Sequence, residues 1–227
     1  MKDEEIDDVL KRAAGPPPEV DTALIQRITG SIGANLRPVR PLPPTWLLRM
    51  VVAIVCAGAA AIAGVALGIQ GLQKMHLAEA ATLFAALAVF IWLAAESCVS
   101  EMVPGSRHIM TPKRLMAAAC VAMIAIFALL FRGYHVEQFV AQGLPCLRAG
   151  LALAAPVALA CWLVLRRGLA VDRSAAGLAF GILAGLSGFA MLELHCPNFE
   201  AAHVMVWHTA VPLLSGLAGL LVVWRRR

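Results

Sequence analysis

The chain has 227 residues, of which 60% are hydrophobic and 15% are charged, and its mean hydropathy is +0.79. This composition argues against an ordinary soluble domain and favours a membrane protein. The net charge of +5 does not indicate a nucleic-acid-binding protein, because a membrane topology accounts for the basic residues. We therefore expect no direct contact with nucleic acid.

Residues 1–45 are predicted to form a short, partly helical cytoplasmic tail. They hold half of the 14 acidic residues and seven of the 13 prolines. The stretch DEEIDDVLKRAAG has apolar residues at helical spacing, acids at its start and bases at its end, which matches the helix dipole. It predicts a first amphipathic helix.

A second amphipathic helix is predicted in VDTALIQRITGSIGANL. Asp21 or Thr22 provides the N-cap, and Gly33 lies near the expected end. The apolar stripe of this helix consists of Val20, Leu24, Ile28 and Ile32. The segment RPVRPLPP then predicts an extended connection to the membrane.

Two helices this short bury too little apolar surface to offset the entropy of ordering the backbone, so they are expected to need a partner. That partner is either another protein or the membrane surface. The acidic first helix is unsuited to anionic lipid, which favours a protein, whereas the second helix fits both. The predicted contacts of the first helix are the apolar anchors Ile6, Val9 and Leu10 and the acids Asp3, Glu4, Glu5, Asp7 and Asp8.

Residues 46–227 contain six uncharged stretches, each close to the roughly 20 residues that cross a bilayer as a helix. The predicted spans are 48–70, 77–97, 112–132, 147–165, 174–194 and 203–224. Charged residues beside the shorter stretches are expected at helix ends, with head groups at the interface; they are Glu79, Glu96, Arg114, Arg132, Arg148 and Arg166. The sequence predicts an all-α membrane protein whose six transmembrane helices form a bundle.

The orientation follows from the basic residues. All but three of the 19 Lys and Arg residues fall on the side of the membrane that holds the N-terminus; the exceptions are Lys74, Arg132 and Arg148. By the positive-inside rule, both termini of this multi-pass protein are then cytoplasmic.

Glycines recur at a spacing of four in two spans. Gly64 and Gly68 lie in the first span, and Gly177, Gly181 and Gly185 lie in the fifth. Such stripes let helix backbones approach closely in lipid. They indicate either dimerisation or packing inside one bundle, and we favour the second interpretation.

Two cysteines are predicted on the non-cytoplasmic side. Cys196 falls in the tight connection between spans five and six, and Cys146, in QGLPCLRAG, falls at the start of span four. A proline adjoins each cysteine and limits the local freedom of the chain. Two thiols in an oxidising compartment can pair, or together bind a soft metal ion. The remaining cysteines are expected to be unreactive core residues; they are Cys56, Cys98, Cys120 and Cys161.

Histidines near Cys196 extend the set of candidate metal ligands to His195 and His203. His208 follows His203 by five residues, which is about 140° around an ideal helix, so the two are not expected to share a face. An interfacial or hydrogen-bonding role is the alternative for these histidines. Glu193, at the end of span five, either orients a histidine, binds a cation or faces water.

Patterns typical of enzymes are missing from the sequence. It has no hydrolase triad, phosphate-binding loop, His-Glu-x-x-His or Cys-x-x-Cys motif. We therefore expect no enzyme activity, and no cofactor beyond a transient soft metal ion at the cysteine pair.

The short tail, the six spans, the outer LPC and the segment ELHCPN…HVMVWH together resemble the NrsF-like family of bacterial anti-sigma factors. The resemblance extends from Trp46 to Trp224. It implies an inner-membrane protein that holds an extracytoplasmic-function sigma factor and releases it under stress, with two outer cysteines taking part in sensing. Here these would be Cys146 and Cys196, and the sigma factor would be the partner of the tail.

Two functions follow from the sequence. The first is this anti-sigma factor, which would release its partner when the cysteine pair meets metal or redox stress. The second is a small membrane transporter or a redox, metal- or cofactor-binding protein, with Cys196, His203 and His208 around a haem, a quinone or copper. The spans are nearly free of ionisable groups at mid-membrane depth, which disfavours an ion pathway.

Overall fold

The computed structural model describes residues 21–35, 42–106, 108–131 and 138–224, together with Glu5, Asp8, Val9, Arg12 and Tyr134. Every regular element within these residues is a helix, so the predicted all-α class is confirmed. The chain divides into two compact units, Met1–Pro41 and Leu42–Arg227.

The first unit contains α2 (Thr22–Asn35), which is the predicted second amphipathic helix. Asp21 is its N-cap, because the carboxylate Oδ1 accepts hydrogen bonds from the N–H groups of Ala23 and Leu24 at 2.9 and 3.2 Å. Leu24 and Ile28 of the apolar stripe are 50% and 47% exposed, so this face of the helix is open. Five of the predicted contacts in the first helix lie outside the described residues; they are Asp3, Glu4, Ile6, Asp7 and Leu10.

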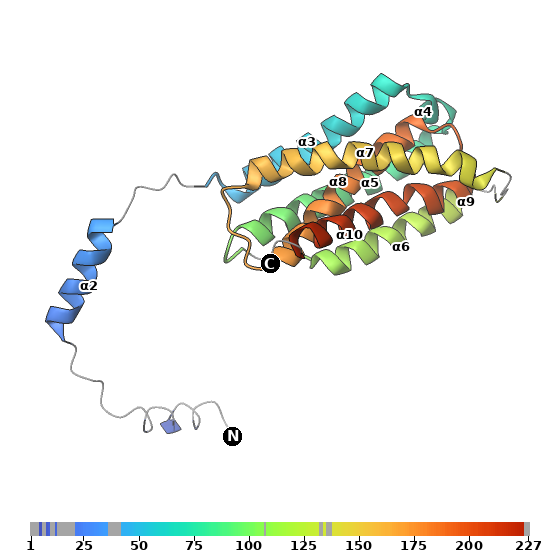
Figure 1. Ribbon diagram of the computed structural model, residues 1–227. Helices are drawn as coiled ribbons and strands as arrows, with labels where there is room; N and C mark the ends of the chain where they lie inside the picture. The colour runs from blue at the N-terminus through green and yellow to red at the C-terminus, as the bar shows by residue number, and fades with distance from the viewer. Residues whose placement is uncertain are drawn as a thin grey trace. The chain divides into compact units, whose positions relative to one another are not determined.

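The second unit is a bundle of six membrane-spanning helices (Figure 1). The first five are α3 (Thr45–Leu67), α5 (Leu77–Met102), α6 (Pro112–Leu130), α7 (Phe139–Leu165) and α8 (Arg173–His195). The sixth consists of α9 (Ala201–His203), a π-helical turn η1 (Val204–His208) and α10 (Ala210–Trp224). Each span is long and apolar enough to cross a membrane, which confirms the predicted six-span architecture.

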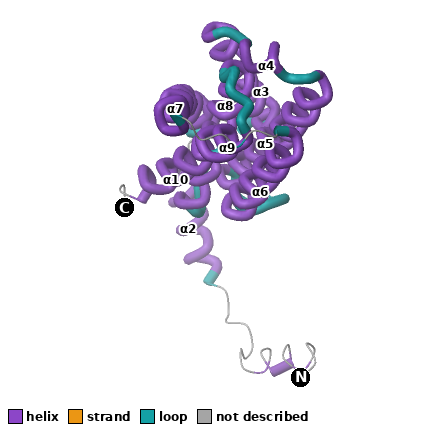
Figure 2. The backbone as a smooth tube through the Cα atoms, turned by 90° about the vertical axis from the view of Figure 1, so that its right-hand side faces the viewer, coloured by secondary structure: helices purple, strands orange, loops and turns teal. Residues whose placement is uncertain are grey.

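Helix α8 lies in the middle of the bundle, where it packs against α10, α7, α5 and α3 (Figure 2). Protein buries 94% of its apolar stretch, compared with 22–33% for the other five spans. Lipid and protein both require apolar surface, so this difference comes from position and not from composition.

Glycines allow this central position. A Cβ atom at Gly181 or Gly185 would collide with Ser215 or Pro212 of α10, so the two backbones can approach only because these side chains are absent. The Ser215 hydroxyl donates to the Gly181 carbonyl across the same contact, at 2.7 Å. The glycine stripe of the fifth span therefore packs inside the bundle, as favoured above.

The fourth span begins earlier than predicted. The sequence analysis places its start near residue 147, whereas α7 begins at Phe139. Pro145 therefore lies inside the helix, where it removes one backbone hydrogen bond that the long span tolerates. As a result, Cys146 lies about two turns into the helix and not at its start.

Glu96 also differs from its prediction. It was expected at a helix end with its head group at the interface, but α5 continues to Met102 and Glu96 is 1% exposed. Arg49 of α3 lies beside it, with Nη2 3.8 Å from Oε1. The neighbouring guanidinium compensates the buried carboxylate, which is how an acid is accommodated inside a span.

One end of the bundle holds α4 (Gln70–Lys74), the start of α7 and the loop between α8 and α9 (Figure 1). A Cβ atom at Gly71 of α4 would collide with the backbone carbonyls of Glu193, Leu194 and Cys196. This close contact covers the end of α8, next to the residues described below.

Candidate metal and thiol site

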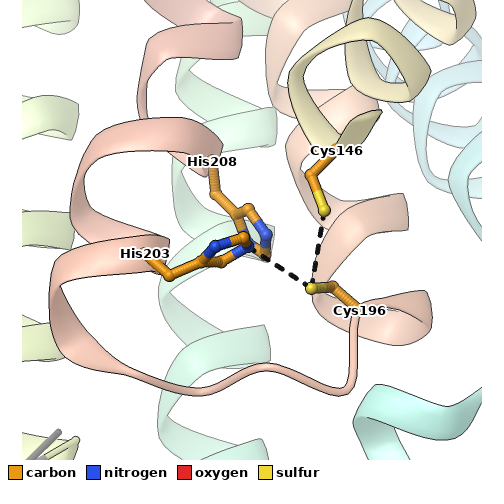
Figure 3. Close-up of side chains that lie close together, drawn as sticks. All are labelled: Cys146, Cys196, His203 and His208. Atoms are coloured by element: carbon orange, nitrogen blue, oxygen red, sulfur yellow. Dashed lines mark hydrogen bonds between the residues drawn. The ribbon is translucent and has the colours of Figure 1, made fainter. Parts of the chain in front are cut away.

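Three segments bring two thiols and two imidazoles together at this end of the bundle. Cys146 comes from α7, and Cys196 is the residue that follows α8. His203 ends α9, and His208 ends the π-helical turn η1. Figure 3 shows the four side chains converging from these segments. We call Cys146, Cys196, His203 and His208 the thiol–imidazole cluster.

The sulfur of Cys196 contacts two other members of the cluster. Its Sγ lies 3.6 Å from Cys146 Sγ and 3.6 Å from His203 Nε2. One ligand atom from each of the four residues lies within 4.8 Å of the others. Because a disulfide bond is only about 2.05 Å long, both cysteines are free thiols.

His208 reaches the cluster through the π-helical turn, contrary to the sequence expectation. That expectation assumed a regular α-helix, in which five residues rotate about 140° beyond a full turn and so do not return to the same face. In η1 the Thr209 N–H bonds to the Val204 carbonyl, five residues earlier, at 3.4 Å. This wider turn places His203 and His208 on one face, with their ring centroids 5.2 Å apart.

Pro212 gives a local reason for the irregular turn. In a regular helix its nitrogen would bond to the His208 carbonyl, but proline has no N–H and its ring clashes with that carbonyl. Helices commonly distort at such a position. The sequence therefore contained a signal for the altered spacing, in the proline four residues after His208.

Glu193 orients His208. Its Oε1 lies 2.6 Å from His208 Nδ1, and both side chains are 0% exposed. Of the three roles considered from the sequence, the contact with a histidine is therefore the one observed, and exposure to water is excluded. In the neutral ring, an Nδ1–H that donates to the carboxylate leaves a lone pair on Nε2, and this nitrogen has no hydrogen-bond partner among the described residues.

His195 lies outside the cluster, although it was a candidate ligand. Its Nδ1 is 3.0 Å from the Gly68 carbonyl oxygen, so the ring is directed towards the end of α3. Residues adjacent in sequence point in different directions where a helix ends, which explains why Cys196 and His195 separate. The structure thus brings together Cys146, Cys196 and His203 of the predicted set and adds His208.

Neighbouring side chains cover the cluster. Asn198 Nδ2 donates to Gln142 Oε1 at 2.9 Å and so holds the loop after Cys196 against α7. Phe199 stacks on Phe131 with ring centroids 5.2 Å apart. Cys196, His203 and His208 are consequently 0–3% exposed, whereas Cys146 is half-buried.

Hydrogen bonding with Cys146 raises the pKa of the Cys196 thiol, and burial adds to the increase, while the neighbouring imidazoles oppose it. The neutral thiol is therefore the resting form of Cys196 at neutral pH. Such a group reacts slowly until a metal ion or a base removes its proton. Chemically, the cluster can form a disulfide or hold a soft or borderline metal ion.

Three of the other four thiols lie in the core, as predicted, whereas Cys120 does not. Cys56 and Cys161 meet between α3 and α7, with their sulfurs 3.6 Å apart, and Cys98 is fully buried. Cys120 is half-buried in α6. None of these four is part of the thiol–imidazole cluster.

The family model of NrsF, described as negative regulator of sigma F, matches residues 32–226. The chain belongs to the NrsF family. The match includes all six spans and the whole thiol–imidazole cluster, and it begins within α2. No curated protein and no solved structure gives a significant match to the chain.

Membership of the NrsF family confirms in general terms that the chain regulates a sigma factor negatively and that a sigma factor is its partner. Regulation of this kind is not an enzymatic activity. It favours the regulatory hypothesis over a transporter or a membrane redox protein.

Proposed function

We propose that this NrsF protein is an anti-sigma factor of the bacterial inner membrane, which holds an extracytoplasmic-function sigma factor and releases it under metal or redox stress. The observation that supports this proposal best is the pair of free thiols of Cys146 and Cys196, whose sulfurs are 3.6 Å apart. Such a pair can react with an oxidant or a metal ion and so detect the stress. Membership of the family indicates that the regulated partner is a sigma factor, and the six apolar spans indicate a location in the membrane.

The thiols lie on the periplasmic side in this proposal, and both termini lie in the cytoplasm. The support is the positive-inside rule, since the predicted topology leaves only Lys74, Arg132 and Arg148 of the 19 Lys and Arg residues on the side proposed to be periplasmic.

Labelling at the two ends of the bundle tests this orientation. Leu77, at the end that holds the thiols, is 87% exposed, and Val171, at the opposite end, is 82% exposed. We expect an impermeant maleimide to label Leu77→Cys in intact spheroplasts and to label Val171→Cys only after lysis. The native chain serves as the background control. The reverse pattern would show that the thiols face the cytoplasm.

Two reactions of the thiols would link Cys146 of α7 to Cys196, the residue that follows α8. In oxidation, an S–S bond forms while the thiols give up two protons and two electrons to an oxidant such as a quinone or another disulfide. In metal binding, the ion replaces the two thiol protons. Either product ties α7 to the segment that follows α8.

Release of the sigma factor requires that this tie stabilises one state of the bundle over another, because only a differential effect shifts a population. A tenfold loss of affinity for the sigma factor needs about 1.4 kcal/mol of coupling. The tail would receive this change through α3, which it precedes in the chain.

Deletion of residues 1–14 tests the proposed contact, in which Ile6, Val9 and Leu10 are the anchors. We expect the deletion to lower co-purification of the sigma factor by about tenfold or more, because it removes the apolar anchors and the acids around them. Deletion of residues 22–35, which removes α2, is the comparison, and the membrane level of each variant is the control. Undiminished capture without residues 1–14 would refute the contact, and loss only without α2 would move it there.

A further inference from the structure

We propose that Cys146, Cys196, His203 and His208 form a four-ligand site for a Zn²⁺-like divalent cation, and that Glu193 positions His208 for it. This site extends the sensing role proposed above, and only its signalling consequence rests on that role. Binding of the cation itself follows from the residues alone.

The distances in the cluster fit a tetrahedral ion. Bonds of about 2.3 Å to sulfur and about 2.0–2.1 Å to nitrogen give tetrahedral edges of about 3.8 Å between two sulfurs and about 3.6 Å between sulfur and nitrogen. The two sulfurs are 3.6 Å apart, and Cys196 Sγ is 3.6 Å from His203 Nε2. A cation can therefore be accommodated with small side-chain adjustments.

The fourth ligand is a buried nitrogen that lacks a partner. His208 is 0% exposed, and its Nε2 has no hydrogen-bond partner among the described residues. A buried polar atom without a partner is destabilising. Figure 3 shows the His208 ring beside His203 and facing the sulfurs, so a cation bound there would satisfy the nitrogen.

Glu193 completes the arrangement that metal-binding histidines commonly show. A ligand histidine usually donates its second N–H to a carboxylate, which fixes the ring and makes the ligand nitrogen more basic. The 2.6 Å contact between Glu193 Oε1 and His208 Nδ1 has this geometry. Glu193 is thus a positioning residue and not a ligand.

The π-helical turn adds an independent argument, because such turns are found frequently at functional sites. Without η1, His208 would point away from His203, and the cluster would have three ligands.

Two thiolates and two neutral imidazoles also balance the charge of a divalent cation within a buried site. Binding replaces the two thiol protons, so it becomes tighter as the pH rises.

Titration with Co²⁺ tests the site, because a tetrahedral ion with thiolate ligands gives intense visible bands and a sulfur-to-cobalt charge-transfer band. The full-length protein, reduced and metal-free in detergent, is titrated without a sigma factor. We expect one Co²⁺ per chain with these bands, and displacement by Zn²⁺. Absence of the tetrahedral spectrum would overturn the proposal.

Variants identify the ligands in the same experiment. His208→Ala and His203→Ala should each lose the tetrahedral bands, whereas the control His195→Ala should keep them, because His195 faces Gly68. Glu193→Gln should keep the bands but weaken Co²⁺ binding by about 10–100-fold. An unchanged spectrum and affinity for His208→Ala would refute the fourth ligand, and elution of each variant as a single species in gel filtration confirms that it is folded.

The pair formed by Cys56 and Cys161 is a potential second source of cobalt bands, since its sulfurs are also 3.6 Å apart. The double variant Cys146→Ser with Cys196→Ser separates the two, and it should give no bands. Bands that persist would place the ion at the core pair and overturn the proposal. Failure here leaves the anti-sigma proposal intact, because capture of the sigma factor is measured separately.

Discussion

The Cys196→Ser variant is expected to lose stress-induced release of the sigma factor while still repressing it. Serine keeps the size of the side chain, but it can neither form a disulfide with Cys146 nor supply a thiolate to a cation. A sigma-dependent reporter measured before and after exposure to Cd²⁺ should rise about tenfold with the native chain, equivalent to about 1.4 kcal/mol of coupling. With the variant it should stay at the uninduced level.

The matched control for this experiment is Cys120→Ser, which alters a half-buried thiol of α6 outside the cluster. It should respond like the native chain, and Cys146→Ser should behave like Cys196→Ser. Full induction in both Cys146→Ser and Cys196→Ser would refute sensing by this pair. Constitutive expression in every strain, including the native one, would instead count against sequestration.

The Arg49→Met variant is expected to lose about 3–5 kcal/mol of stability, because it leaves the buried Glu96 carboxylate without its compensating charge. Glu96 is 1% exposed, and neither of its carboxylate oxygens has a hydrogen bond among the described residues. Unfolding by SDS in mixed micelles measures the loss.

A second substitution makes this prediction specific to the ion pair. The double variant Arg49→Met with Glu96→Met removes both charges and should regain most of the lost stability, since an apolar pair of similar size needs no compensation. Arg148→Met, on the exposed side of α7, is the control for loss of one arginine. A double variant as unstable as Arg49→Met would show that the loss comes from packing of the arginine and not from charge.

The six spans could be predicted from the sequence because a bilayer demands about 20 apolar residues without charge, wherever the helix sits in the bundle. The central place of α8 could not be predicted in the same way. A helix surrounded by protein and one surrounded by lipid are both apolar, so only the glycines at 177, 181 and 185 indicated close packing.

The topology alone predicts that two of the four cluster residues, Cys146 and Cys196, lie at the same end of the bundle. The positions of His203 and His208 relative to each other depend on the local helix geometry. An even number of spans between Cys146 and Cys196 puts both thiols at one end of the bundle, whatever the details of packing. His208 was assigned to the wrong face because residue spacing was converted to angle with regular α-helical values. The π-helical turn and the neighbouring Pro212 change that conversion, and the role of Glu193 becomes evident only once His208 is in place.

In the proposed mechanism, the burial of α8 determines whether movement of this helix is transmitted to protein or to lipid. Cys196 directly follows this helix, and protein covers 94% of the helix's apolar stretch. A displacement of α8 therefore passes along neighbouring helices and scarcely disturbs acyl chains. We expect the part of the proposed signal that α8 carries to depend little on bilayer thickness and lipid composition, whereas any movement of α3 or α7, whose apolar stretches are each 22% buried, would depend on them.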